Sequence, residues 1–202
     1  MWVVCGLGNP GPEYARSRHN VGFMVVDCLA ERADVAWNAS RRSALVGQTR
    51  LRGDRVLLVK PLTYVNRSGY ALAGILYAHQ VMPAQVVTVS DDVDLSVGRL
   101  RVARKGGAGG HRGLQSVIMS LGSEEFPRIR VGIGRPGRGC SMADYVLEPL
   151  EGYEWQELTL AVPIAADAVE SVVTEGVEKA MERFNQRCRR TVTPGDEGAQ
   201  RG

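Results

Sequence analysis

The stretch MWVVCGLGNPGPEYARSRHNVGFMVVDCLAER, residues 1–32, decides the fold. Its first five residues form an apolar run that predicts a buried strand, and no basic leader precedes the run, so we expect no signal peptide. Glycine and proline then interrupt the chain at residues 6–12. From residue 21 to residue 32, apolar side chains recur at helical spacing, at Val21, Met24, Val25, Cys28 and Leu29. A strand, a glycine-rich loop and a helix in this order are typical of an α/β domain.

The rest of the chain continues the alternation of strands and helices. Residues 44–51 and 55–60 flank Arg52-Gly53-Asp54 and predict a β-hairpin, which makes the sheet mixed. Further strands are predicted at residues 85–90, 99–103 and 128–133, and helices at residues 66–77, 111–121 and, as a pair around Gly176, about 152–188. We therefore predict a single three-layer α/β domain over residues 1–190, with a mixed β-sheet flanked by helices. The polar residues 191–202 are predicted to be a disordered tail.

Composition narrows the class of protein. The 202 residues are 44% hydrophobic and 23% charged, values that exclude a disordered or collagen-like chain. No apolar run approaches the roughly 18 residues that cross a bilayer, so no membrane partner is expected. The four cysteines form no C-x-x-C pair and predict neither a disulfide framework nor a zinc site. Reduced thiols of this kind favour a cytoplasmic protein.

Charge is unevenly distributed along a chain whose net charge is only +3. Five cations and no acid lie between residues 99 and 112, including Arg104, Lys105 and Arg112. Nine acids and one cation lie between residues 148 and 182. We therefore expect one region to attract polyanions such as nucleic acid and the other to repel them.

Two glycine-rich segments are candidate ligand-binding loops. Residues 6–11 match G-x-G-x-x-G after a strand, but no helix follows directly and no acid ends a second strand, so a tight loop holding Asn9 is favoured over a dinucleotide site. A dinucleotide-dependent enzyme remains the weaker alternative. Residues 106–110 are four glycines and an alanine before His111. Beside the cation cluster they predict an anion cradle, because glycine lets a backbone approach a ligand closely.

His19 is the candidate base among three histidines, since it follows the Asn9 loop and precedes a helix. His79 is interpreted as structural or exposed, and His111 as a helix cap or a shaper of its loop. The run Asp91-Asp92-Val93-Asp94 follows a strand, where catalytic groups of α/β folds gather. Its spacing does not fit a Ca²⁺ loop, and no paired histidines indicate zinc. One aspartate orienting a histidine, with water as the nucleophile, fits these residues better.

Six motifs in order resemble the bacterial-type peptidyl-tRNA hydrolase family over about residues 1–188. They are GLGNPG (6–11), RHNVG (18–22), KPLTYVNRSG (60–69), DDVDL (91–95), GGHRGL (109–114) and RVGIGRP (130–136). The resemblance implies an α/β fold and an esterase, without cofactor or metal, that hydrolyses peptidyl-tRNA to peptide and free tRNA. It also implies a cytoplasmic monomer that takes part in translation by recycling tRNA.

The resemblance implies roles residue by residue. His19 would activate water, Asp91 would keep His19 basic, and Asn9 would distinguish blocked from free aminoacyl-tRNA. Tyr14, Tyr64 and Asn66 would contact the substrate, with Asn66 also a donor to the oxyanion. The basic residues Arg104 and Lys105 are expected to hold tRNA phosphates, with binding that weakens steeply with salt.

The sequence departs from the family pattern at three positions. Arg112 stands where the family usually has asparagine; it can donate hydrogen bonds and meet phosphate but cannot accept a bond as asparagine does. Val65 stands where methionine is common and Ser90 where histidine is common. Arg112 keeps a second alternative open, a catalytically inactive RNA-binding homologue of the same fold.

Overall fold

The structure is a computed structural model that describes residues 1–40, 42–137 and 139–186. Seven strands form one mixed sheet in the order β2-β3-β4-β1-β5-β7-β6. Strands β4, β1, β5 and β7 run parallel, whereas β2, β3 and β6 pair antiparallel to their neighbours. The strand bounds are β1 Trp2–Gly6, β2 Asn38–Ser40, β3 Ala44–Leu51, β4 Asp54–Pro61, β5 Val86–Asp92, β6 Leu100–Ala103 and β7 Arg128–Gly132. The predicted α/β class with a mixed sheet is confirmed.

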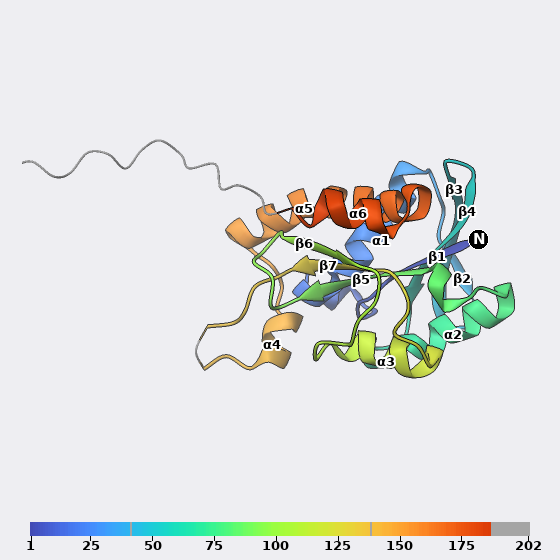
Figure 1. Cartoon of the computed structure of the whole chain (residues 1–202). Helices are drawn as coiled ribbons and strands as arrows, with labels where there is room; N and C mark the ends of the chain where they lie inside the picture. The colour runs from blue at the N-terminus through green and yellow to red at the C-terminus, as the bar shows by residue number, and fades with distance from the viewer. Residues whose placement is uncertain (41, 138, 187–202) are drawn as a thin grey trace, which may run out of the picture.

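Helices cover both faces of the sheet (Figure 1). One face carries α1 (Val21–Arg32), α5 (Gly152–Glu175) and α6 (Val177–Phe184), and the other carries α2 (Ser68–His79) and α3 (Arg112–Leu121). Successive side chains of a strand point to opposite faces, so Val3 joins the α2–α3 core and Val4 joins the α1–α5 core. No helix in the described part of the chain is long and apolar enough to cross a membrane.

The start of α1 lies directly against the sheet because Gly22 has no side chain. A Cβ at Gly22 would lie 2.4 Å from the carbonyl oxygen of Val89 and 2.5 Å from the backbone nitrogen of Leu7. Such distances cannot be relieved by moving a flexible side chain, since both atoms belong to the backbone. The close approach places the residues before α1 at the carboxyl ends of β1 and β5.

Some predicted boundaries were wrong. The helix predicted from residue 66 begins at Ser68, after a 3₁₀ turn, η3 (Val65–Arg67). Strand β5 does not end before the aspartates: Asp91 and Asp92 pair with Val131 and Gly132 of β7, so the ladder carries them as strand residues. Strand β2 and the short helix α4 (Met142–Leu147) were not predicted, because three and six residues are too few for periodicity to show.

Short 3₁₀ turns complete the fold: η1 (Pro12–Tyr14), η2 (Arg18–Asn20) and η4 (Pro83–Gln85). The predicted helices over 21–32 and 111–121, the hairpin and the pair of helices around Gly176 are confirmed, with ends shifted by at most a few residues. The tail predicted at residues 191–202 lies outside the described residues.

Candidate active site

Polar residues from three separate parts of the chain meet at the carboxyl ends of β1 and β5. His19 lies in η2 just before α1, Asp91 lies near the end of β5, and His111 caps α3. These side chains are almost fully shielded, with His19 8% and Asp91 4% exposed. Carboxyl ends of neighbouring parallel strands are where α/β folds bind ligands, so this edge is the candidate active site.

His19 contacts Asp91 through a short hydrogen bond. Nδ1 of His19 lies 2.7 Å from Oδ1 of Asp91. The pKa of Asp91 reflects opposing effects: burial raises it, but the charges and hydrogen bonds of His111 and His19 prevail and hold it well below its usual range. The carboxylate is therefore ionised and can only accept, so Nδ1 of His19 carries the proton and Nε2 keeps its lone pair.

His111 contacts the same carboxylate oxygen with its other ring nitrogen. Nε2 of His111 lies 2.9 Å from Oδ1 of Asp91, and Nδ1 accepts the backbone N–H of Leu114 at 3.1 Å. A ring nitrogen that accepts has no proton, so Nε2 of His111 is the donor to Asp91. The cap predicted for His111 is confirmed, while its contact with Asp91 was not predicted.

The two imidazoles therefore have opposite tautomers, with ring centroids 4.8 Å apart. Both nitrogens of His111 and one of His19 are occupied, which leaves Nε2 of His19 without a partner within the described ranges. Burial lowers the pKa of His19, but the charge and hydrogen bond of Asp91 raise it, and the net effect is a pKa above the ordinary value of 6.5. This nitrogen is suited to accept a proton near neutral pH.

Asn9 is held rigidly beside His19. Its backbone N–H donates to Oδ1 of Asn20 at 2.8 Å, and Nδ2 of Asn20 donates to the Asn9 carbonyl at 2.9 Å. The side-chain oxygen of Asn9 accepts the backbone N–H of Val65 at 2.8 Å. Nδ2 of Asn9 has no partner in the part of the chain that the structure describes, so this side chain presents a free hydrogen-bond donor. Asn20 is a site residue that the sequence reasoning did not assign.

The predicted substrate-contacting residues are exposed or half-buried. Asn66 is exposed in η3, next to the Val65 that Asn9 holds, and Tyr64 just before it is 63% exposed. Tyr14 is half-buried at the end of η1. Arg112 is exposed as the first residue of α3, directly after His111. Their contacts with substrate remain predictions.

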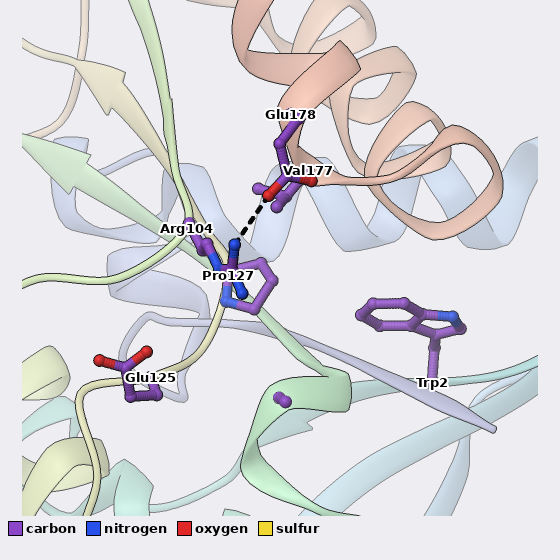
Figure 2. A pocket seen from close by; sticks show the side chains of 7 residues that line it. Trp2, Arg104, Glu125, Pro127, Val177 and Glu178 are labelled. Atoms are coloured by element: carbon purple, nitrogen blue, oxygen red, sulfur yellow. Dashed lines mark hydrogen bonds and ion pairs between the residues drawn. The ribbon is translucent and has the colours of Figure 1, made fainter.

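Arg104 and Lys105 lie at the other end of the sheet. Ala103 pairs with Arg128, whereas Asp91 pairs with Val131, three residues or about 10 Å further along β7. Figure 2 shows Arg104 with Trp2 and Pro127 among the residues that line one pocket, and the guanidinium of Arg104 pairs with Glu178 of α6 at 3.0 Å. Lys105 pairs with Glu125 at 2.8 Å.

The basic and acidic stretches, expected to act as opposing regions, thus contact each other at Arg104 and Glu178. The two stretches meet because α6 packs beside β6, which brings together Arg104 and Glu178, 74 residues apart in the chain. The predicted role of both cations in holding tRNA phosphates stays a prediction.

The glycine loop of residues 106–110 is anchored by the side chain of Arg128 in β7, and its predicted role as an anion cradle stays a prediction. A buried guanidinium, that of Arg128, donates to the carbonyls of Gly107 and Glu124 at 3.1 and 3.0 Å. Burial lowers the pKa of Arg128 to about 10. Arg130 lies next to Gly109 and pairs with Asp92 at 3.0 Å. These contacts hold the loop that delivers His111 to Asp91.

The three carboxylates at residues 91–94 take separate partners. Asp91 contacts the histidines, Asp92 pairs with Arg130, and Asp94 pairs with Arg135 at 2.5 Å. The group that could hold a metal is instead His19, Asp91 and His111, whose ligand atoms lie within 4.8 Å of one another. A metal bound there would have to displace the protons through which both rings contact Asp91.

Comparison with known proteins gives one consistent result. A family model described as peptidyl-tRNA hydrolase matches residues 3–192. The chain is 46% identical over 186 residues to the peptidyl-tRNA hydrolase of Carboxydothermus hydrogenoformans, which covers 92% of this chain and 99% of that protein. It is 46% identical over 184 residues to the peptidyl-tRNA hydrolase of Moorella thermoacetica, covering 91% and 97%.

Solved structures agree with the sequence comparisons. The crystal structure of peptidyl-tRNA hydrolase from Acinetobacter baumannii is 32% identical and superposes with a TM-score of 0.86, covering 92% of this chain and 94% of that one. Uridine phosphorylase from Vibrio fischeri, at 11% identity and a TM-score of 0.52, shares the fold alone.

Proposed function

Because this chain belongs to the peptidyl-tRNA hydrolase family, we propose that it hydrolyses the ester of peptidyl-tRNA with Nε2 of His19 as the general base. Hydrolysis of peptidyl-tRNA is the activity of the family, and His19 as the base is the role that the resemblance implies. The observation that carries the assignment is that Nε2 is the ring nitrogen of the His19–Asp91–His111 group without a partner in the described residues.

The reaction proceeds in two steps. Nε2 of His19 takes a proton from water as the water oxygen attacks the ester carbonyl, and Asp91 stabilises the resulting imidazolium through Nδ1. The tetrahedral intermediate then collapses: the bond to the 3′ oxygen of the tRNA breaks, and His19 returns the proton to that oxygen. A positioned base of this kind contributes about 10²–10⁴-fold, and each oxyanion donor about 10²–10³-fold. Asn66 is the proposed oxyanion donor.

Asn9 supplies a physical reason for sparing free aminoacyl-tRNA. Its Oδ1 accepts the N–H of Val65, which fixes the orientation of the amide, and its Nδ2 donor has no partner among the described residues. A donor suits the carbonyl of a peptide bond and opposes the ammonium of an unblocked amino acid, which would also lose its hydration. We therefore propose that Asn9 discriminates because its fixed Nδ2–H group disfavours the ammonium of unblocked aminoacyl-tRNA.

The remaining assignments follow the same scheme. Tyr14 and Tyr64 are proposed to contact the substrate, and Arg112, the exposed residue after His111, is proposed to bind a phosphate near the 3′ end of tRNA. We propose that the enzyme acts as a monomer in the cytoplasm, without a membrane partner.

The test is turnover of an N-blocked aminoacyl-tRNA by the unaltered protein, His19→Ala and His79→Ala. His79 is an exposed histidine at the end of α2 and is the matched control. We expect His19→Ala to lose at least about 10²-fold in kcat and His79→Ala to keep the full rate. Near-normal turnover by folded His19→Ala contradicts the assignment. If the unaltered protein binds tRNA without turnover, it is the inactive RNA-binding homologue instead.

A further inference from the structure

A buried guanidinium lies one residue before His19. Arg18 is 8% exposed and begins the single 3₁₀ turn η2. The three side chains of this turn extend to three different parts of the protein: Arg18 to the α4–α5 connection, His19 to Asp91, and Asn20 to Asn9. The proposed base is thus the middle residue of a turn that is anchored on both sides.

The contacts of Arg18 are concentrated on residues 145–154. Nη1 donates to the carbonyl of Tyr145 at 3.2 Å and reaches that of Glu148 at 3.5 Å. Nη2 donates to the carboxylate of Glu154, at the start of α5. The guanidinium also lies over the ring of Tyr145, 4.1 Å from its centroid. A planar group with several fixed donors suits such a set of acceptors, whereas a lysine ammonium cannot reproduce it.

Backbone contacts reinforce the same junction. The N–H of Leu150 donates to the carbonyl of Arg16 at 2.8 Å, and Ser17 forms an antiparallel bridge with Pro149. Tyr145 is itself held, since its hydroxyl donates to the carbonyl of Ile133 at 2.7 Å, just after β7. The surface that receives Arg18 is therefore fixed to the sheet that also carries Asp91.

This arrangement matters because a 3₁₀ turn of three residues has little rigidity of its own. Without Arg18, no side chain would hold the start of the turn to the α4–α5 connection, and only the backbone contacts of Arg16 and Ser17 would remain there. The hydrogen bond from Nδ1 of His19 to Asp91 would then have to fix both the ring and its backbone, and the ring could rotate or shift. A displacement of about 1 Å at a reacting group can cost about 10²-fold in rate.

We propose that Arg18 is a positioning residue that clamps η2 to the α4–α5 connection and so fixes the direction of Nε2 of His19. The proposal rests on the assignment of His19 as the base. It concerns the geometry of that base and not the binding of tRNA, so its effect belongs in kcat and not in KM.

The chain offers a matched control in Arg32. Arg32, at the other end of α1, donates to Asp167, Glu170 and the carbonyl of Pro163 at 2.8, 3.2 and 3.0 Å, so it also joins α1 to α5. Arg32 joins α1 to α5, and Arg18 joins the turn before α1 to the start of α5 and the residues before it. Removing either guanidinium therefore weakens a comparable contact. Only Arg18 lies next to the base.

The experiment compares Arg18→Met with Arg32→Met in three readouts: kcat and KM on an N-blocked aminoacyl-tRNA, the melting temperature, and the NMR signal of the hydrogen-bonded Nδ1–H of His19. We expect Arg18→Met to lose about 10–100-fold in kcat with KM changed by less than about threefold, and to broaden or shift the Nδ1–H signal. Arg32→Met is expected to keep kcat and the signal, whatever it loses in melting temperature.

Two milder variants cover the case in which Arg18→Met does not fold. Arg18→Lys keeps a charge without the fork, and Glu154→Gln keeps an acceptor without the charge. Both are expected to lower kcat less than Arg18→Met, in the same direction and with KM unchanged. A folded Arg18 variant with full kcat and an unaltered signal, or equal losses of kcat in the Arg18 and Arg32 variants, overturns the proposal. Failure of the base assignment is distinguishable, because His19→Ala would then remain active.

Discussion

The two ends of the sheet use charged residues in opposite ways. At the carboxyl end, His19 and His111 meet on one oxygen of Asp91, and all three side chains are at most 10% exposed. At the amino end, Arg104 and Lys105 each pair with a glutamate in side chains that are 62–68% exposed. Interactions between charges are strong where water is excluded and weak where it is not. The buried end should therefore control the rate of hydrolysis and the pKa of His19. The exposed end should have small, salt-dependent effects on the binding of tRNA.

The largest expected effect follows from removing the charge at the buried end. Asp91→Asn leaves an amide oxygen where Oδ1 accepts from both rings but removes the negative charge that stabilises the imidazolium of His19. The corresponding aspartate-to-asparagine change costs about 10⁴-fold in a comparable triad, so we expect a loss of about 10³–10⁴-fold in kcat. Steady-state kinetics on an N-blocked aminoacyl-tRNA measures this loss.

The same variant gives a signed change in pH dependence. In the unaltered protein Asp91 raises the pKa of His19 above 6.5, so kcat/KM should rise with pH through that raised value. Asparagine removes the raising charge while burial still lowers the pKa, so the acid limb of the residual activity should move to lower pH. An acid limb that stays in place would mean that Asp91 does not control His19.

An intermediate effect is expected at Asn9. Asn9→Ala removes the free Nδ2 donor and the acceptor for the N–H of Val65. We expect kcat/KM for blocked aminoacyl-tRNA to fall by about 10²-fold, while the slow cleavage of unblocked aminoacyl-tRNA falls less. The measurement is the ratio of the two rates. A ratio equal to that of the unaltered protein would remove Asn9 from discrimination.

The sequence predicted features that arise from neighbouring residues better than contacts between residues far apart in the chain. The helix over residues 21–32 was predicted to the residue because twelve residues with apolar periodicity define a face. The meeting of His19 with Asp91 was anticipated from strand ends and from the family resemblance. The contact of His111 with the same oxygen was not, because the cap role explained His111 without it. Asn20 gave no signal at all, since its hydrogen bonds to Asn9 depend on how the loop closes.

The pairing of Arg104 with Glu178 shows the corresponding limit for charge. A linear count places the cation in a basic stretch and the acid in an acidic one, and only the packing of α6 beside β6 brings them together. Charge runs along the sequence therefore do not show which opposite charges the fold brings together. Strand β2 and helix α4 were missed for a simpler reason, their shortness.

The smallest expected effect lies at the exposed end. Arg104→Gln with Lys105→Gln should raise KM for full-length tRNA by only a few-fold, since each cation exchanges a weak surface pair for a phosphate. KM for a short aminoacyl-nucleotide should not change, and kcat should stay constant. Titrating salt sharpens the comparison, because the slope of log KM against log salt should decrease in the double variant. Equal changes with both substrates would exclude these cations from tRNA binding.

The central claim, that Asp91 fixes the two imidazoles in opposite tautomers and leaves Nε2 of His19 free, is tested most directly by nitrogen NMR of the histidine rings. At about pH 9, well above the ordinary histidine pKa of about 6.5, we expect the proton on Nδ1 in His19 and on Nε2 in His111. A proton on Nε2 of His19 under those conditions would contradict the account, because the proposed base would then have no lone pair with which to activate water.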